Sequence, residues 1–404
     1  MRILLLHRTF PGQFLYLASA LVQERKHRVI FGTASPNGTL PGVEKQLYGP
    51  VAKAHSKTHH YAQSLEGAVL EAQATWRLGQ RLQEEGFVPD LVYGHSGWGP
   101  TLFIKDLFPQ TKLVCYFEWF YRAHGGSHNF DPTRKLGPDA EAEVRTKNAP
   151  ILIDLEACDA GLAPTRWQQS QFPVEFRNKI KVLHDGIPTG IVRPRSGARL
   201  VLPEIGLDLG DVEELVTYVA TGMEPMRGFP QFMEAVSLLQ RRRPRCHVVV
   251  VGEDRTEYSN PAPEGRTYRE LMLERFEYDH TRLHFVGRRP YGDYLQVLQA
   301  SGVHVYLSYP YILSWSLLEA MAAGCLVVGS DTPPVTEMVR EGFNGLLVDF
   351  FAPEQLAERI GEVFEHPDRM AALRDRARLT VVERYALDKL LPRQIGWLEG
   401  IVRA

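Results

Sequence analysis

The segment 309–324 (YPYILSWSLLEAMAAG) contains the clearest residues for ligand chemistry in the chain. A helix is expected to begin near Ser314, and the N–H groups of a first helical turn carry partial positive charge that suits a phosphate. Glu319 lies about one and a half turns further on, where its carboxylate can accept hydrogen bonds from ligand hydroxyl groups. Alternatively, Ser316 and Glu319 form only a capping box. The residues alone leave both interpretations open.

Three residues in the first half of the chain also follow expected strands. Gly12 lies in a turn where its small size would let the backbone approach a phosphate or sugar, although an ordinary turn glycine is an equal alternative. His95 lies in a glycine-rich loop that would expose it, so a structural and a functional role are equally supported. Glu118 lies among aromatic residues, where an unpaired carboxylate is costly to bury. We therefore expect Glu118 to pair, for example with Arg122, or to face a substrate.

Composition restricts the class of protein. The chain has 404 residues, a formal net charge of -2 and 44% hydrophobic residues, which favours a folded protein of two domains over a disordered or nucleic-acid-binding one. Its four cysteines are widely spaced and include no CxxC pair, so neither a disulfide framework nor a zinc cluster is indicated. No apolar run reaches the length of a transmembrane helix. We expect a cytoplasmic protein, with peripheral contact at the inner membrane face left open.

The elements that must position these residues alternate between short apolar runs and helix-like segments. This alternation predicts an α/β fold with two doubly wound, Rossmann-like domains that face each other across a cleft. We expect domains at 1–194 and 195–384, with a helix at about 385–404 that packs back on the first. Expected strands in the first domain are 2–6, 28–31, 91–93, 112–117, 161–163 and 179–183, and in the second 215–220, 246–251, 282–286, 303–307, 326–329 and 345–348.

An ordered set of motifs in the second half resembles the GT4 family of retaining glycosyltransferases, which have the GT-B fold and use nucleotide-diphospho-sugars. The motifs are 222–228 (GMEPMRG), 250–252 (VVG), 284–287 (HFVG), 317–324 (LLEAMAAG) and 341–348 (EGFNGLLV). In the first half, 94–99 (GHSGWG) and 116–121 (YFEWFY) resemble a GT4 subgroup with a distinctive N-terminal domain. Each motif is weak, but their order along the chain is a strong signal.

The resemblance implies roles for particular residues. Glu319 corresponds to the glutamate that holds the nucleotide ribose, and Arg227 stands where the family has a lysine that clamps the diphosphate. A guanidinium suits that role because it can bond two phosphate oxygens. A solvated residue at a helix N-terminus is the alternative for Arg227. The expected catalytic residues are Arg227, Glu319, His95 and Glu118. The expected donor-binding residues are Gly12, Gly222, Arg227, Arg288, Tyr311, Ile312, Leu313, Ser314, Trp315, Ser316 and Glu319.

The sequence departs from the family pattern at two places. Tyr311 replaces the family's first glutamate, which contacts the donor sugar, and residues 220–222 (ATG) replace a segment with an arginine. Arg255, Arg288 and Arg289 follow expected strands and are candidates for the missing charge, with solvated surface positions as the alternative.

Taken together, the resemblance implies a retaining hexosyltransferase that needs no divalent metal and no cofactor beyond its donor. No Asp-x-Asp triplet is present, and that triplet marks metal-dependent enzymes of another glycosyltransferase class. The expected partners are a nucleotide-diphospho-sugar and a hydroxyl acceptor, which can be a saccharide, a lipid-linked compound or a small molecule. A sugar-nucleotide epimerase or hydrolase of GT-B fold and a non-catalytic nucleotide-sugar-binding subunit remain the alternatives.

Overall fold

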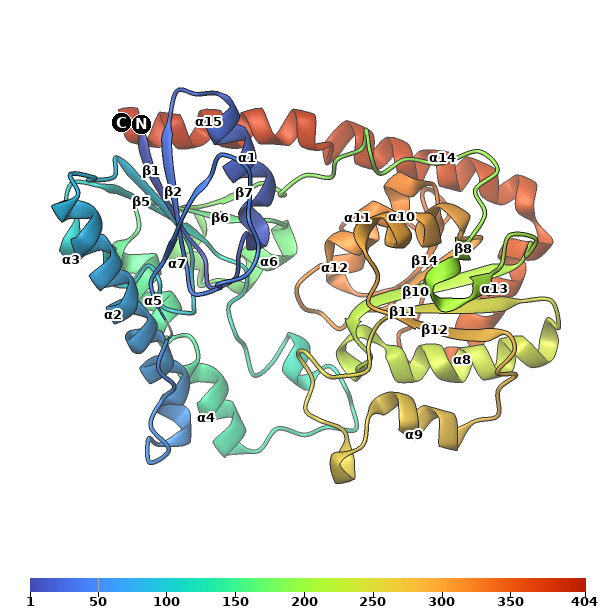
Figure 1. The fold of residues 1–404 in the computed structure, drawn as a ribbon. Coiled ribbons are helices and arrows are strands. Elements are labelled where there is room, and N and C mark those ends of the chain that lie inside the picture. Colours follow the sequence, from blue (N-terminus) through green and yellow to red (C-terminus); the bar gives the residue numbers. More distant parts are fainter. Residues whose placement is uncertain (50) are drawn as a thin grey trace. The chain divides into compact units, whose positions relative to one another are not determined.

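The computed structural model describes residues 1–49 and 51–404. The chain divides into two compact units, one formed by Met1–Asp185 with Asp388–Ala404 and the other by Gly186–Leu387. Both are parallel α/β sheets with helices on either side (Figure 1). No helix in the described ranges combines the length and the apolar character needed to cross a bilayer.

The first unit is built on a seven-stranded parallel sheet in the order β3-β2-β1-β4-β5-β6-β7. Its strands are β1 (Arg2–Leu6), β2 (Arg28–Thr33), β3 (Glu44–Leu47), β4 (Leu91–His95), β5 (Lys112–Tyr116), β6 (Ala160–Ala163) and β7 (Ile180–Val182). Its helices are α1 (Leu15–Gln23), α2 (Gln63–Glu84), α3 (Ile104–Leu107), α4 (Pro138–Thr146), α5 (Ala149–Ala157), α6 (Arg166–Gln171), α7 (Val174–Arg177) and α15 (Leu387–Arg403), with 3-10 turns η1 (Gly12–Phe14), η2 (His60–Ala62) and η3 (Ser127–Asn129).

The apolar first strand shows why this sheet carries helices on both faces. Ile3 and Leu5 lie in one core cluster, with side chains of α1 and α15, whereas Leu4 and Leu6 lie in another, with side chains of α2 and α5. Successive side chains of a strand point to opposite faces, so a strand that is apolar throughout must be covered on both. The terminal helix α15 contributes Leu390 to the first of these clusters.

The second unit is built on a six-stranded parallel sheet in the order β12-β11-β10-β13-β14-β15, beside a small antiparallel hairpin. The strands are β8 (Val201–Leu202) and β9 (Leu207–Asp208) of the hairpin, then β10 (Leu215–Gly222), β11 (His247–Glu253), β12 (Leu283–Gly287), β13 (Val303–Tyr306), β14 (Leu326–Ser330) and β15 (Leu346–Val348). The helices are α8 (Phe229–Arg242), α9 (Tyr268–Arg275), α10 (Tyr291–Ala300), α11 (Trp315–Ala323), α12 (Pro333–Thr336), α13 (Pro353–Glu365) and α14 (Pro367–Arg384), with 3-10 turns η4 (Pro203–Ile205), η5 (Pro225–Arg227) and η6 (Pro263–Gly265).

The strand order reverses direction once in each sheet. In the second unit the chain runs outward from β10 to β12 and then returns to the other side of β10 with β13. Crevices for ligands form at the carboxyl ends of strands where such a reversal occurs. The corresponding reversal in the first unit lies between β1 and β4.

The boundary between the units differs from the sequence expectation of 194/195. Ile187 exchanges backbone hydrogen bonds of 2.8 Å with Tyr385 and Leu387, and Val192 is buried in the same core cluster as Leu317. Residues after Asp185 therefore belong to the second unit, although the Pro- and Arg-rich stretch that follows them resembles a linker.

Candidate functional site

A pocket of about 340 Å³ lies at the strand reversal of the second unit. Its lining comes from the carboxyl ends of β10 and β11, from the residues after β12, and from the start of α11. Of the residues expected to bind a donor, the pocket brings together Arg288, Ser314, Trp315, Ser316 and Glu319. Arg255 and Arg289 also line it, whereas Gly222, Arg227, Tyr311, Ile312 and Leu313 are not among its lining residues.

Gly222 has a steric role beside the pocket. A Cβ at this position would lie 2.4 Å from the carbonyl oxygen of Arg255, far inside normal contact distance. The glycine therefore allows the segment after β10 to approach the segment after β11 closely, and these two segments form one wall of the pocket.

Glu319 holds a fixed position on α11. One carboxylate oxygen accepts a hydrogen bond from the Tyr291 hydroxyl and the other from the Tyr294 hydroxyl, each at 2.7 Å. Ser314 is the N-cap of α11, and its hydroxyl accepts from the Ser316 amide at 3.3 Å. The capping-box interpretation of Ser316 and Glu319 is therefore wrong. Each carboxylate oxygen keeps a lone pair with which it can accept a further hydrogen bond.

The residues at the start of α11 are held in place by contacts with β13 and with the hydrophobic core. Tyr306 at the end of β13 accepts a hydrogen bond from the Ser314 amide through its hydroxyl, at 2.9 Å. Leu313 packs in the hydrophobic core beside Leu317, so only its backbone is available to a ligand. Trp315 packs partly against the same core.

Arg227 is buried, with 8% of its surface exposed, so the alternative of a solvated helix-end residue is wrong. Its Nη1 donates to the Ser308 hydroxyl and to the Ile312 carbonyl, both at 3.0 Å. Burial alone would lower its pKa, but the acidic groups of Tyr306, Tyr258, Glu224 and Tyr311 outweigh burial and raise the pKa, which keeps the guanidinium charged. Arg227 thus places a cation at the loop that leads into α11.

Glu224 is a further organising residue of this loop that the sequence did not reveal. It is fully buried, and its Oε2 accepts hydrogen bonds from the backbone N–H groups of residues 257–259 at 3.0, 2.9 and 2.7 Å. This carboxylate fastens the segment that carries Arg227 to the loop after β11. Tyr258 in that loop lies with its ring 5.3 Å from the Arg227 guanidinium and 5.4 Å from the ring of Tyr311.

The arginines that line the pocket differ in their pairing. Arg255 forms ion pairs with Glu253 and Glu257, and Arg288 is 85% exposed and lies 3.9 Å from Glu253. The Nε of Arg289 donates to the Arg288 carbonyl at 3.2 Å. The three guanidiniums lie beside two carboxylates, those of Glu253 and Glu257, so this wall keeps an excess of one positive charge, to which the dipole of α11 adds.

A second group of polar side chains lies at the carboxyl ends of β1, β4 and β5 in the first unit. His7 Nε2 lies 2.6 Å from the side-chain oxygen Oε1 of Gln13, and the side-chain nitrogen Nε2 of Gln13 donates to Glu118 Oε1 at 2.9 Å. Burial, reinforced by the neighbouring His95, lowers the pKa of His7 to about 3, so this ring is neutral. A neutral ring that donates from Nε2 completes a chain of hydrogen bonds from His7 through Gln13 to Glu118.

His95 is the last residue of β4 and is buried, so the expectation of an exposed loop residue is wrong, and its ring approaches the other oxygen of the same carboxylate. Its Nδ1 lies 2.8 Å from the Ser96 carbonyl, which can only accept, so Nδ1 carries a proton and Nε2 faces Glu118 Oε2 at 3.5 Å. Burial works to raise the pKa of Glu118, but His95, His7 and Gln13 together lower it, so the carboxylate is charged. The Arg122 guanidinium donates to the Gln171 carbonyl instead, so the pair with Arg122, one of the alternatives for Glu118, is not formed.

Gly12 supports this second group for a reason that needs no ligand. It has a φ of +52°, and a Cβ there would lie 2.4 Å from the His7 ring. The glycine thus allows the turn after β1 to cover His7.

The comparisons with known proteins agree with this architecture. Residues 25–192 match the family described as glycosyl transferase family 4 group, and residues 209–380 match the glycosyl transferases group 1. The D-inositol 3-phosphate glycosyltransferases of Segniliparus rotundus and Nocardioides sp. are 27% and 26% identical over 50% and 61% of this chain. The matched segments span 43% and 56% of those two relatives.

Solved structures match over almost the whole chain. Anabaena HepE in complex with UDP-glucose has a TM-score of 0.73 at 17% identity, covering 99% of this chain and 100% of its own. Sucrose-phosphate synthase from Thermosynechococcus elongatus has a TM-score of 0.72 at 16% identity, covering 99% of this chain and 98% of its own. These neighbours show the GT-B fold. With a family 4 group domain in its first unit and a group 1 domain in its second, the chain belongs to the glycosyltransferases of GT-B fold.

Proposed function

We propose that this protein transfers a sugar from a nucleotide-diphospho-sugar to a hydroxyl acceptor, and that it retains the configuration of the anomeric carbon. The observation that carries the proposal is the pocket in which Glu319, the start of α11 and three arginines converge at the strand reversal of the group 1 domain. Anabaena HepE binds UDP-glucose. A uridine diphospho-sugar is therefore the first donor to test.

In this proposal the donor lies in the second unit. Glu319 accepts hydrogen bonds from the ribose hydroxyls, and its two tyrosine partners hold the carboxylate in place. As the bond between the anomeric carbon and the phosphate oxygen breaks, negative charge develops on the leaving diphosphate. Arg255, Arg288 and the start of α11 stabilise this charge, and Arg227 adds its cation from the neighbouring loop. This arrangement replaces a divalent metal, which we propose the reaction does not need.

The acceptor binds the first unit, near Glu118. The acceptor hydroxyl attacks the anomeric carbon from the face that the diphosphate leaves, and its proton passes to an oxygen of that leaving diphosphate. Glu118 and His95 orient the acceptor hydroxyl, and the link through Gln13 fixes the carboxylate for that task. The protein thus positions the reactants and stabilises charge, and it forms no covalent intermediate.

Product analysis by mass tests this function. The purified chain is incubated with a panel of nucleotide-sugars and acceptors, with and without a chelator. We expect a product whose mass equals acceptor plus sugar, the same rate with chelator, and an unchanged anomeric configuration by NMR. A free sugar would indicate a hydrolase, an isomerised donor an epimerase, and donor binding without turnover a binding subunit.

Variants test two residues beside the donor pocket, Arg227 and Tyr311. Arg227→Ala is expected to reduce turnover by roughly 10²-fold, the effect of losing one charge-stabilising donor. Tyr311→Glu, which restores the family's residue, is expected to change the preferred sugar without changing nucleotide affinity. Unchanged kinetics in the first variant would remove Arg227 from the site, and an identical donor profile in the second would remove Tyr311 from the sugar. The cytoplasmic location expected from the sequence stays a prediction.

A further inference from the structure

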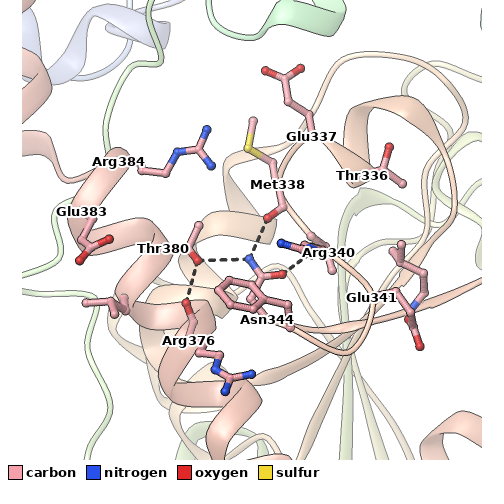
Figure 2. Close-up of a pocket in the computed structure, with 14 residues that line it drawn as sticks. Thr336, Glu337, Met338, Arg340, Glu341, Asn344, Arg376, Thr380, Glu383 and Arg384 are labelled. Atoms are coloured by element: carbon pink, nitrogen blue, oxygen red, sulfur yellow. Dashed lines mark hydrogen bonds between the residues drawn. The ribbon is translucent and has the colours of Figure 1, made fainter.

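A second pocket in the Gly186–Leu387 unit, about 570 Å³ in volume, lies apart from the donor pocket and shares no lining residue with it. We name it the Arg376 pocket. One wall comes from the segment 336–347, between α12 and β15, and the other from the last two turns of α14 (Figure 2). The proposed transfer reaction gives this pocket no role.

Three arginines line the Arg376 pocket without a carboxylate partner among the described residues. Arg340 lies in the 336–347 segment, and Arg376 and Arg384 lie eight residues apart on α14, at opposite ends of the pocket (Figure 2). Their guanidinium groups form no ion pair or hydrogen bond with the described part of the chain. Three glutamates also line the pocket, Glu337, Glu341 and Glu383, and the carboxylate of Glu341 is already bonded to Arg359 and to the Leu347 amide.

Other arginines of the same helix show that free guanidiniums are not a general property of α14. Arg369 bonds Glu362 at 3.0 Å, Arg374 donates to the Gly302 carbonyl at 2.6 Å, and Arg378 donates to two backbone carbonyls. Each of these three stabilises the fold through its N–H donors. Arg376 and Arg384, which face the pocket, keep their donors unused.

Phe343 holds two of the free guanidiniums in the pocket. The Cζ atoms of Arg340 and Arg376 lie 5.5 and 5.2 Å from its ring centroid, on the scale of cation–π contacts. Such a contact positions a guanidinium through the ring face and leaves its N–H groups available to bond an anion. Phe343 itself is 41% exposed, and Leu379 on α14 is also exposed, so the pocket has an apolar side as well.

The buried side-chain amide of Asn344 fixes the two walls of the pocket relative to each other. The Asn344 side chain donates to the Met338 carbonyl at 3.0 Å and to the Thr380 hydroxyl at 3.2 Å, and it accepts from the Arg340 amide at 2.7 Å (Figure 2). These bonds fasten the 336–347 segment to α14. The arginines therefore extend from a fixed frame, which lowers the entropy cost of binding a ligand.

We propose that the Arg376 pocket binds a phosphate group, with an apolar part of the ligand on Phe343 and Leu379. Guanidinium groups bond two oxygens of a phosphate at once and are weakly hydrated, so the two unpaired guanidiniums that contact Phe343, those of Arg340 and Arg376, suit a phosphate better than a lone carboxylate. The phosphate can belong to a soluble phosphate ester or to the headgroup of an anionic lipid. The two sources share the same recognition chemistry, and the proposal is independent of the proposed transfer reaction.

Binding measurements on the full chain test this proposal. The probes are inorganic phosphate, by equilibrium dialysis, and vesicles of phosphatidylglycerol or of phosphatidylcholine, by sedimentation. The double variant Arg340→Gln/Arg376→Gln is compared with the wild type and with Arg369→Gln, which removes an arginine of the same helix outside the pocket. The donor pocket is the same in all three proteins, so phosphate bound there contributes equally.

We expect the double variant to lose at least about 10-fold in affinity for one probe, because two charge-assisted contacts are removed. Arg369→Gln is expected to stay within about twofold of the wild type, since its guanidinium lies outside the pocket. Loss with inorganic phosphate assigns a soluble ligand, and loss only with phosphatidylglycerol assigns a lipid headgroup. Equal binding of both probes by the double variant and the control, or no binding by the wild type, would overturn the proposal. If the double variant melts at a lower temperature, each single variant provides the same comparison.

Discussion

The two tyrosines that bond Glu319 provide a sharp test of how the donor pocket is held. Tyr294→Phe removes the hydroxyl that donates to Oε2 at 2.7 Å, and Tyr291→Phe removes the one that donates to Oε1 at the same distance. The bonds are alike, but their surroundings differ. Tyr294 is 9% exposed and lies in the core, whereas Tyr291 is 45% exposed, so water can replace only the second hydroxyl.

The magnitude follows from this difference in burial. A buried hydrogen bond to a charged group contributes about 1.5–3 kcal/mol, so Tyr294→Phe is expected to lower the free energy of unfolding by that amount. Nucleoside diphosphate affinity should fall by about 10-fold, which corresponds to about 1.4 kcal/mol, because the carboxylate is no longer held for the ribose. Tyr291→Phe should cost less than about 1 kcal/mol, since solvent substitutes for the lost donor.

Urea unfolding and calorimetric titration with UDP, or with whichever diphosphate binds in a panel, give both quantities. Glu319→Gln serves as the reference, because it removes the negative charge to which both tyrosine hydroxyls donate. Equal losses in the two tyrosine variants, or a larger loss in Tyr291→Phe, would show that burial does not set the strength of these bonds. An unchanged affinity in Tyr294→Phe would show that Glu319 does not need this support to bind the nucleotide.

Further predictions concern both units. Gly222→Ala places a Cβ against the Arg255 carbonyl and is expected to cost about 1–3 kcal/mol of stability and to weaken nucleotide binding; unchanged titration curves and melting temperature would contradict this. His95→Gln is expected to reduce kcat by on the order of 10²-fold while nucleotide affinity stays the same, because its partner Glu118 lies in the first unit; a raised nucleotide Kd would place His95 elsewhere. Burial raises the pKa of Asp154 to about 6, so its contribution to stability is full below pH 3.8 and is lost as the pH rises through 6. Asp154→Asn should therefore remove a decline of about 2 kcal/mol between pH 4 and pH 7, measured by urea unfolding at both pH values, and an identical pH slope in the variant would refute the shift.

The sequence was most informative where an apolar run is buried on both faces. For this reason the bounds of strands such as β1 and β10 agree with the expected bounds to within a few residues. The edge strand β3 was missed because its sequence, EKQL, is polar and carries no apolar signal. The hairpin of β8 and β9 was missed because each strand has only two residues.

The candidate site was predictable in its positions but not in its contacts. Glu319 and Ser314 were identified because a helix start after a strand is visible in the sequence. The partners of Glu319 come from α10, more than twenty residues earlier, and no local pattern links Tyr294 to it. Likewise, Gln13 reaches Glu118 across 105 positions of sequence, so only the folded sheet brings the two together.

The most direct test of the central claim is a crystal structure of this chain with its nucleoside diphosphate. The account predicts that the diphosphate lies among Arg255, Arg288 and the first turn of α11, with the ribose hydroxyls bonded to Glu319. A nucleotide bound elsewhere, with Glu319 touching only Tyr291 and Tyr294, would contradict it.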